Sequence, residues 1–229
     1  MIAERVAVVR ERIARAAARA GRRPQDVTLV AVSKTHPPQA VREAFAAGLR
    51  DFGENRLQEA EAKIAVLDDL RAGGLRWHLV GHLQSNKAKK ARQLFDCIHS
   101  LDDAELGGKL AGAAGGRSLA VLVQVDLGRE ATKFGAPEGR LFDLLAALKA
   151  QGGLRVTGLM TLPPFAEDPE AVRPLFRRLR ELRDLATGRG LLAGSELSMG
   201  MSHDLEVAIE EGATMVRVGT AIFGERGGN

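Results

Sequence analysis

The sequence of 229 residues has little of several features that mark particular classes of protein. It has one cysteine, Cys97, which cannot form an internal disulfide, so a secreted scaffold held by internal disulfides is excluded. It has no uninterrupted apolar run of about 18 residues, so no transmembrane helix is predicted. The first residues mix charged with apolar side chains, unlike a secretory signal. Together these absences favour a cytoplasmic protein with no membrane partner.

Aromatic residues are also scarce, with eight Phe, one Trp and no Tyr. No aromatic surface on which single-stranded nucleic acid could stack is therefore evident. The formal net charge is +4, but 33 basic and 29 acidic residues are interspersed along the chain. The one basic cluster, from Lys87 to Arg92, fits a solvated helix face. We expect no nucleic-acid partner.

What the sequence does contain is a regular succession of apolar runs. Residues 2–20 form an amphipathic pattern that predicts a helix, ended by Gly21. After it come eight short apolar runs, each followed by a helix-like stretch, and several runs are apolar on both faces, which is typical of buried parallel strands. The runs are Val27–Ser33, Leu49–Gly53, Trp77–Gly81, Cys97–Leu101, Leu119–Asp126, Val156–Leu162, Glu196–Gly200 and Met215–Phe223.

Eight strand-then-helix units in about 200 residues predict an α/β fold, a (β/α)8 TIM barrel preceded by an extra N-terminal helix. We expect one domain over residues 1–229, with its core at about 27–224, no second β-rich domain, and a flexible loop at Gly112–Gly116. A doubly wound open sheet is the alternative. No Gly-x-Gly-x-x-Gly follows the first strand, where a dinucleotide fold would carry it.

Active sites of barrels lie at the carboxyl ends of the strands, and the first strand ends at Lys34. Val30, Val32 and Lys34 share one face by the period of two, so Lys34 should lie at the barrel mouth above an apolar wall. Partial desolvation lowers the pKa of a lysine and exposes a nucleophilic amine, as a Schiff-base lysine requires. An ordinary solvated lysine at a strand end remains the simpler interpretation of this segment alone.

The last two units contain a candidate phosphate site. Met201-Ser202 follows the seventh strand, and Ser202 is predicted to cap the helix Asp204–Glu211, where free backbone N–H groups attract anions. After the eighth strand, Gly219 allows close backbone approach and Thr220 offers a hydroxyl. Loops after strands seven and eight commonly hold a phosphate in barrels. A routine capped strand–turn–helix is the alternative for the first of these loops.

Arg217 lies in the middle of the eighth strand with valine on both sides. The period of two puts it inside the barrel, where a guanidinium must be paired. It could hydrogen-bond a cofactor ring nitrogen, or form a structural ion pair with an acidic side chain.

Other strand ends are less informative, although Asn55 falls beside the mouth after the second strand. His78 and His82 do not converge on a strand, so we predict no metal site, and no Gly-x-Ser-x-Gly elbow indicates a serine hydrolase.

Several of these residues lie in stretches that make the chain resemble the pyridoxal phosphate homeostasis proteins, single-domain relatives of the alanine racemase barrel. The matching stretches run from residue 31 to 224, and their combination is highly specific. They are Ala31–Thr35, Phe52–Asn55 with Gln58-Glu59, Trp77–Lys87, Ile98–Asp102, Lys133–Gly135, Gly158–Met160, Leu197–Asp204 and Arg217–Gly224.

The resemblance implies that pyridoxal 5′-phosphate (PLP) is the cofactor, held as a Schiff base on Lys34. It also implies that the phosphate lies against Ser202, Gly219 and Thr220, with Arg217 near the pyridine nitrogen and Asn55 near the ring. Members of the family act in the balance of vitamin B6 and amino-acid pools, with no well-established catalytic turnover.

The absence of tyrosine bears on catalysis. Alanine racemases of this barrel type use the cofactor lysine and a tyrosine from a second, β-rich domain as two bases, and this sequence has neither that domain after residue 224 nor any Tyr. We therefore predict a PLP-binding homeostasis protein with no catalytic residues. We expect it to be monomeric, with apo PLP-dependent enzymes as acceptors. A PLP enzyme, such as a slow amino-acid racemase or a lyase, is one alternative. A barrel enzyme that uses Lys34 on a phosphorylated sugar or keto-acid is the other.

Overall fold

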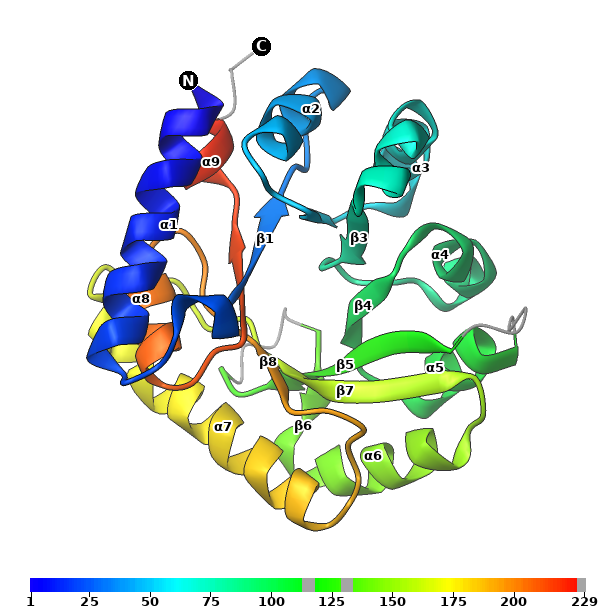
Figure 1. Ribbon diagram of the computed structural model, residues 1–229. Helices are drawn as coiled ribbons and strands as arrows, with labels where there is room; N and C mark the ends of the chain where they lie inside the picture. The colour runs from blue at the N-terminus through cyan, green and yellow to red at the C-terminus, as the bar shows by residue number, and fades with distance from the viewer. Residues whose placement is uncertain (113–117, 129–133, 226–229) are drawn as a thin grey trace.

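The computed structural model describes residues 1–112, 118–128 and 134–225, and these fold into a parallel β-barrel surrounded by helices (Figure 1). Eight strands form the barrel, and a ninth, very short strand is added outside it. They are β1 (Thr28–Val32), β2 (Asp51–Glu54), β3 (Arg76–Leu79), β4 (Cys97–Leu101), β5 (Leu119–Asp126), β6 (Ala136–Pro137), β7 (Leu154–Met160), β8 (Glu196–Ser198) and β9 (Met215–Val218).

The barrel closes because β1 pairs with both β2 and β9, while β4 pairs with β5, and every pairing is parallel. The predicted (β/α)8 barrel and all eight predicted strands are confirmed, and the open doubly wound sheet is wrong. Strand β6 was not predicted. It consists of Ala136 and Pro137 alone, which is too short to leave a periodic pattern, and it pairs with the end of β5.

The helices lie on the outside of the barrel (Figure 1). The predicted N-terminal helix is confirmed as α1, whose apolar face is buried and whose Arg12 bonds Glu206 of α8 at 2.6 Å. The helices are α1 (Ile2–Arg19), α2 (Pro38–Ala46), α3 (Leu57–Val66), α4 (Ala88–Leu94), α5 (Ala104–Gly112), α6 (Leu141–Ala150), α7 (Arg173–Gly188), α8 (Leu205–Glu210) and α9 (Thr220–Phe223).

The last predicted strand, Met215–Phe223, is too long, because β9 stops at Val218 and α9 begins at Thr220. Ile222 and Phe223 are buried as part of this short helix rather than of the strand. A continuous apolar run cannot by itself separate a strand from a helix that follows at once. Gly219 lies between β9 and α9, so Thr220 begins a helix and does not continue the strand.

Two apolar layers hold the fold together. The larger lies between strands and helices and contains Phe52, Trp77 and Phe176. The smaller consists of the buried side chains of Cys97, Leu122 and Met160. Within the described residues, no helix is both long and apolar enough to span a membrane. Of the predicted loop Gly112–Gly116, only Gly112 is among the described residues. Lys133 also lies outside them.

Candidate cofactor site

A cavity of about 540 Å³ opens at the carboxyl ends of the strands, and all seven predicted site residues line it. They come from the ends of β1 and β2, from β9, and from the loops that follow β8 and β9. A larger hollow of about 680 Å³ lies between α3 and α4 but contains none of the predicted residues. The predicted residues that line the mouth are Lys34, Asn55, Met201, Ser202, Arg217, Gly219 and Thr220.

Lys34 lies two residues beyond the end of β1, half-buried, with Val32 beside it in the cavity wall. The residues on either side of Lys34 are held by buried or half-buried carboxylates. Ser33 Oγ donates to Glu54 Oε1 at 2.6 Å, and the backbone N–H of Thr35 donates to Glu59. Thr35 has φ 66°, a left-handed conformation uncommon outside glycine, which these contacts help to maintain.

Behind this strand end, the ammonium of Lys63 completes a buried polar cluster. Its Nζ donates to Glu54 Oε1 and to the carbonyl of Ser33, each at 2.7 Å. The side chains of Lys63 and Glu54 are 5% and 0% exposed. Burial raises the pKa of Glu54, and the Lys63 ammonium opposes that rise. The sequence did not indicate a role for these residues, because helical periodicity shows only that Lys63 faces inward.

The loop after β8 differs in one respect from the sequence prediction. Ser202 does not cap α8, which starts at Leu205 with Asp204 as its N-cap. Asp204 Oδ1 accepts the N–H of Met201 at 2.6 Å, so the aspartate closes the turn that precedes the helix. Ser202 Oγ instead lies 3.2 Å from Thr220 Oγ1, which brings the two hydroxyls together at one end of the cavity.

Arg217 points into the barrel, as predicted, and is 4% exposed. Its guanidinium donates to Ser198 Oγ at 2.6 Å and to the carbonyl of Thr161 at 2.8 Å. Among the described residues no carboxylate lies within ion-pair distance, so the predicted alternative of a direct ion pair is wrong. Burial lowers the pKa of Arg217 to about 10, and Asp204 opposes this only in part. The group therefore remains a cation and a donor at neutral pH.

Asn55 is placed by the close approach of the next strand end. A Cβ on Gly81 would lie 2.2 Å from the carbonyl oxygen of Asn55, so only glycine fits there. His82, which follows at once, stacks on Phe134 with ring centroids 3.6 Å apart, and both rings line the cavity. His82 and Phe134 were not predicted as site residues, although both lie in the stretches that match the family.

His203 was missed in the same way. It lines the cavity, and its Nε2–H donates to the carbonyl of Glu167 at 3.0 Å. A histidine next to a predicted cap residue could have been noticed from its position alone, since the loop after a barrel strand faces the mouth.

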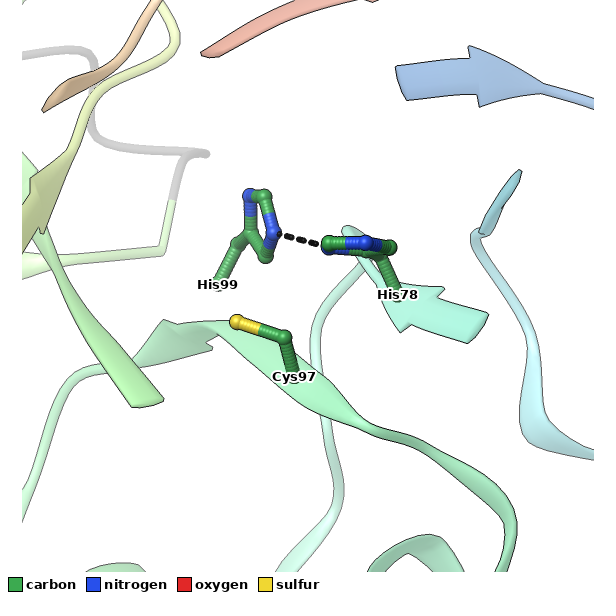
Figure 2. A group of neighbouring side chains, drawn as sticks. All are labelled: His78, Cys97 and His99. Carbon is green, nitrogen blue, oxygen red and sulfur yellow. Dashed lines mark hydrogen bonds between the residues drawn. The ribbon is translucent and has the colours of Figure 1, made fainter. Parts of the chain in front are cut away.

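His78 and His82 do not converge, as predicted. His78 lies inside the barrel and meets His99 of the neighbouring strand, with 2.9 Å between His78 Nδ1 and His99 Nε2 (Figure 2). The donor atoms of His78, Cys97 and His99 all lie within 4.8 Å of one another, a grouping that the sequence analysis did not find.

Comparison with known proteins places the chain in a family. The model of the alanine racemase N-terminal domain matches residues 6–227. The pyridoxal phosphate homeostasis protein of Pseudomonas aeruginosa is 49% identical over 227 residues, covering 98% of this chain and 96% of that protein. The homologous protein of Aquifex aeolicus is 46% identical, with 97% of each chain covered.

Solved structures agree with this placement. PipY of Synechococcus elongatus, solved with PLP bound, superposes with a TM-score of 0.85 at 43% identity, covering 97% of this chain and all of PipY. The alanine racemase of Corynebacterium glutamicum has a TM-score of 0.68 at 20% identity and 59% coverage of its own chain, which shows a shared fold alone. The chain therefore belongs to the alanine racemase N-terminal domain family and, within it, to the pyridoxal phosphate homeostasis proteins.

Proposed function

We propose that this chain holds PLP as a Schiff base on Lys34 and acts in intracellular PLP and amino-acid homeostasis. The observation that carries the proposal is that Lys34 and the hydroxyls of Ser202 and Thr220, far apart in the sequence, line one cavity. Relatives named for PLP homeostasis, and PipY with PLP bound, support the same cofactor.

Each of the seven predicted residues has a part in holding this cofactor. PLP supplies an aldehyde that condenses with a primary amine, which Lys34 offers from a half-buried position. Ser202, Thr220 and the side-chain-free Gly219 bind the phosphate, Met201 forms the adjoining wall, and Asn55 lies beside the ring. Arg217 donates to the pyridine nitrogen.

A permanently charged Arg217 disfavours protonation of the ring nitrogen, so the ring is a weaker electron sink for carbanion chemistry. The sequence also lacks any tyrosine that could serve as a second base. We therefore propose binding and release of PLP rather than catalytic turnover. The single domain of residues 1–229 acts as a cytoplasmic monomer and passes PLP to apo PLP-dependent enzymes.

A PLP enzyme is the second candidate, because His82 and His203 line the cavity and could move a proton. Incubation of the PLP-loaded protein with L-amino acids in deuterated water separates the two candidates. We expect no steady exchange of the Cα proton. Continuous exchange or formation of the other enantiomer, lost in the Lys34→Ala variant, would establish catalysis instead.

The test of the main proposal is reaction of the purified protein with PLP followed by borohydride. We expect a visible absorbance band at about 420 nm, typical of PLP bound to a lysine. Reduction should then fix one PLP on the peptide that contains Lys34, as measured by mass spectrometry. A protein that stays colourless with added PLP contradicts the proposal and favours a barrel enzyme for another phosphorylated compound.

The phosphate assignment predicts that Thr220→Ala weakens PLP binding by roughly tenfold or more, because a hydrogen bond to a charged group is lost. The fold should remain intact, since Thr220 is exposed. Thr187→Ala on the outer helix α7 is the matched control, because its hydroxyl bonds only the carbonyl of Arg183 among the described residues. Equal PLP affinity of the two variants, measured by titration, would remove Thr220 from the phosphate site.

A further inference from the structure

Five polar side chains form a continuous chain through the barrel interior beneath the candidate site. Arg217 lies 2.6 Å from Ser198 Oγ, which lies 2.8 Å from His99 Nδ1. His99 Nε2 lies 2.9 Å from His78 Nδ1, and His78 Nε2 lies 2.9 Å from Asp51 Oδ1. None of the five is more than 7% exposed. This hydrogen-bonded chain of side chains runs from the cavity to the amino end of β2, where Arg76 also binds Asp51 at 2.7 Å.

The two ends of this hydrogen-bonded chain fix the direction of its two terminal hydrogen bonds. A guanidinium can only donate, and an ionised carboxylate can only accept. Burial alone would raise the pKa of Asp51, but the hydrogen bonds from His78 and Arg76 outweigh it and lower the pKa, so Asp51 is ionised at neutral pH. Ser198 therefore accepts from Arg217, and His78 donates its Nε2–H to Asp51.

The histidines between these ends then adopt one tautomer each. A neutral His78 that donates through Nε2 accepts at Nδ1, so His99 donates through Nε2 and accepts the Ser198 hydroxyl at Nδ1. Burial and the neighbouring His78 and Arg217 lower the pKa of His99 well below its usual value, which agrees with a neutral ring. Each of these buried groups has a hydrogen-bond partner, and the charge of Asp51 is paired with Arg76 at the outer end.

We propose that Ser198, His99, His78 and Asp51 are positioning residues that hold Arg217 in one orientation toward the bound cofactor. The inference rests on the proposed binding of PLP. The carbonyl of Thr161 and the hydroxyl of Ser198 take one donor each from the two ends of the guanidinium, so they fix its plane. His99 takes the hydroxyl proton of Ser198, so a lone pair of the Ser198 oxygen faces Arg217. Asp51, whose charge is paired with Arg76, ends the series as a fixed acceptor for His78.

A metal site made of His78, Cys97 and His99 is the competing interpretation of the cluster in Figure 2. Two observations count against it. All four ring nitrogens of His78 and His99 already have hydrogen-bond partners, and a divalent ion with one thiolate would leave a net positive charge beside the buried Arg217.

The first test uses ring-nitrogen NMR of the ¹⁵N-labelled protein without PLP, in which only five histidines contribute signals. We expect His78 and His99 both neutral and protonated at Nε2. A cationic His78 with His99 protonated at Nδ1 reverses the direction of the chain and would overturn the proposal. The NMR measurement is made without PLP, so it tests the direction of the hydrogen bonds even if the protein proves not to bind PLP.

The second test interrupts the series of hydrogen bonds without replacing Arg217. We expect His99→Leu to lower PLP affinity by roughly fivefold and to shift the absorbance band of bound PLP, because Arg217 loses its fixed orientation. Cys97→Ala is the matched control, since Cys97 lies two residues away on the same strand and contributes no atom to the chain. Equal spectra and affinities of the two variants would overturn the proposal, and so would uptake of one Co²⁺ that depends on Cys97. If His99→Leu does not fold, Asp51→Asn takes its place.

Discussion

Replacing Lys34 by alanine should abolish covalent attachment of PLP, with complete loss of the visible band and of the borohydride-fixed adduct. The reason is that Schiff-base formation needs a primary amine within the cavity. Of the described residues that line the cavity, Lys34 alone is a lysine. Its side chain is half-buried and the carboxylates of Glu54 and Glu59 hold the residues on either side of it.

The control for this variant is Lys109→Ala, which removes a partly exposed lysine of α5 that pairs with Glu105. It should keep the band and the adduct unchanged, as measured by absorbance and mass spectrometry. Both variants should show the circular dichroism of the parent protein. An adduct of full intensity in Lys34→Ala, on whichever lysine it forms, would contradict the assignment.

The barrel and its mouth could be predicted because both follow from local periodicity. Each parallel strand leaves a short apolar run, and the alternation of Val30, Val32 and Lys34 indicates the face on which the lysine lies. The rule that barrel sites gather at carboxyl strand ends then connects Lys34 with Thr220, although 186 positions separate them. This prediction did not require knowledge of any contact between particular residues.

What could not be predicted are the partners of the inward-facing polar residues. Periodicity places Arg217 inside the barrel but cannot show that Ser198 accepts from it, or that His99 lies opposite Ser198 from 99 positions away. The prediction that Ser202 caps the helix was wrong for a related reason. Serine and aspartate are comparable N-caps, and only the turn geometry shows that Asp204 takes this position.

The second large effect concerns the buried pair behind Lys34. Replacing Lys63 by methionine should lower the free energy of unfolding by about 3–5 kcal/mol, because the Glu54 carboxylate would be left buried without its cation. Glu54 Oε2 already has no hydrogen-bond partner among the described residues. Urea denaturation measures the change. The control is Lys90→Met, which breaks the half-exposed pair of Lys90 with Glu61 and should cost at most about 1 kcal/mol.

A double variant separates the two roles of this pair. Glu54→Leu combined with Lys63→Met removes both charges, so most of the lost stability should return, as it does when buried ion pairs are replaced by apolar residues. PLP affinity, which Lys63→Met should lower together with stability, should not return with it. Lys63 also donates to the carbonyl of Ser33, and Glu54 accepts the Ser33 hydroxyl, so the backbone before Lys34 would lose both anchors. Recovery of PLP affinity together with stability would mean that the pair supports the barrel wall and does not position Lys34.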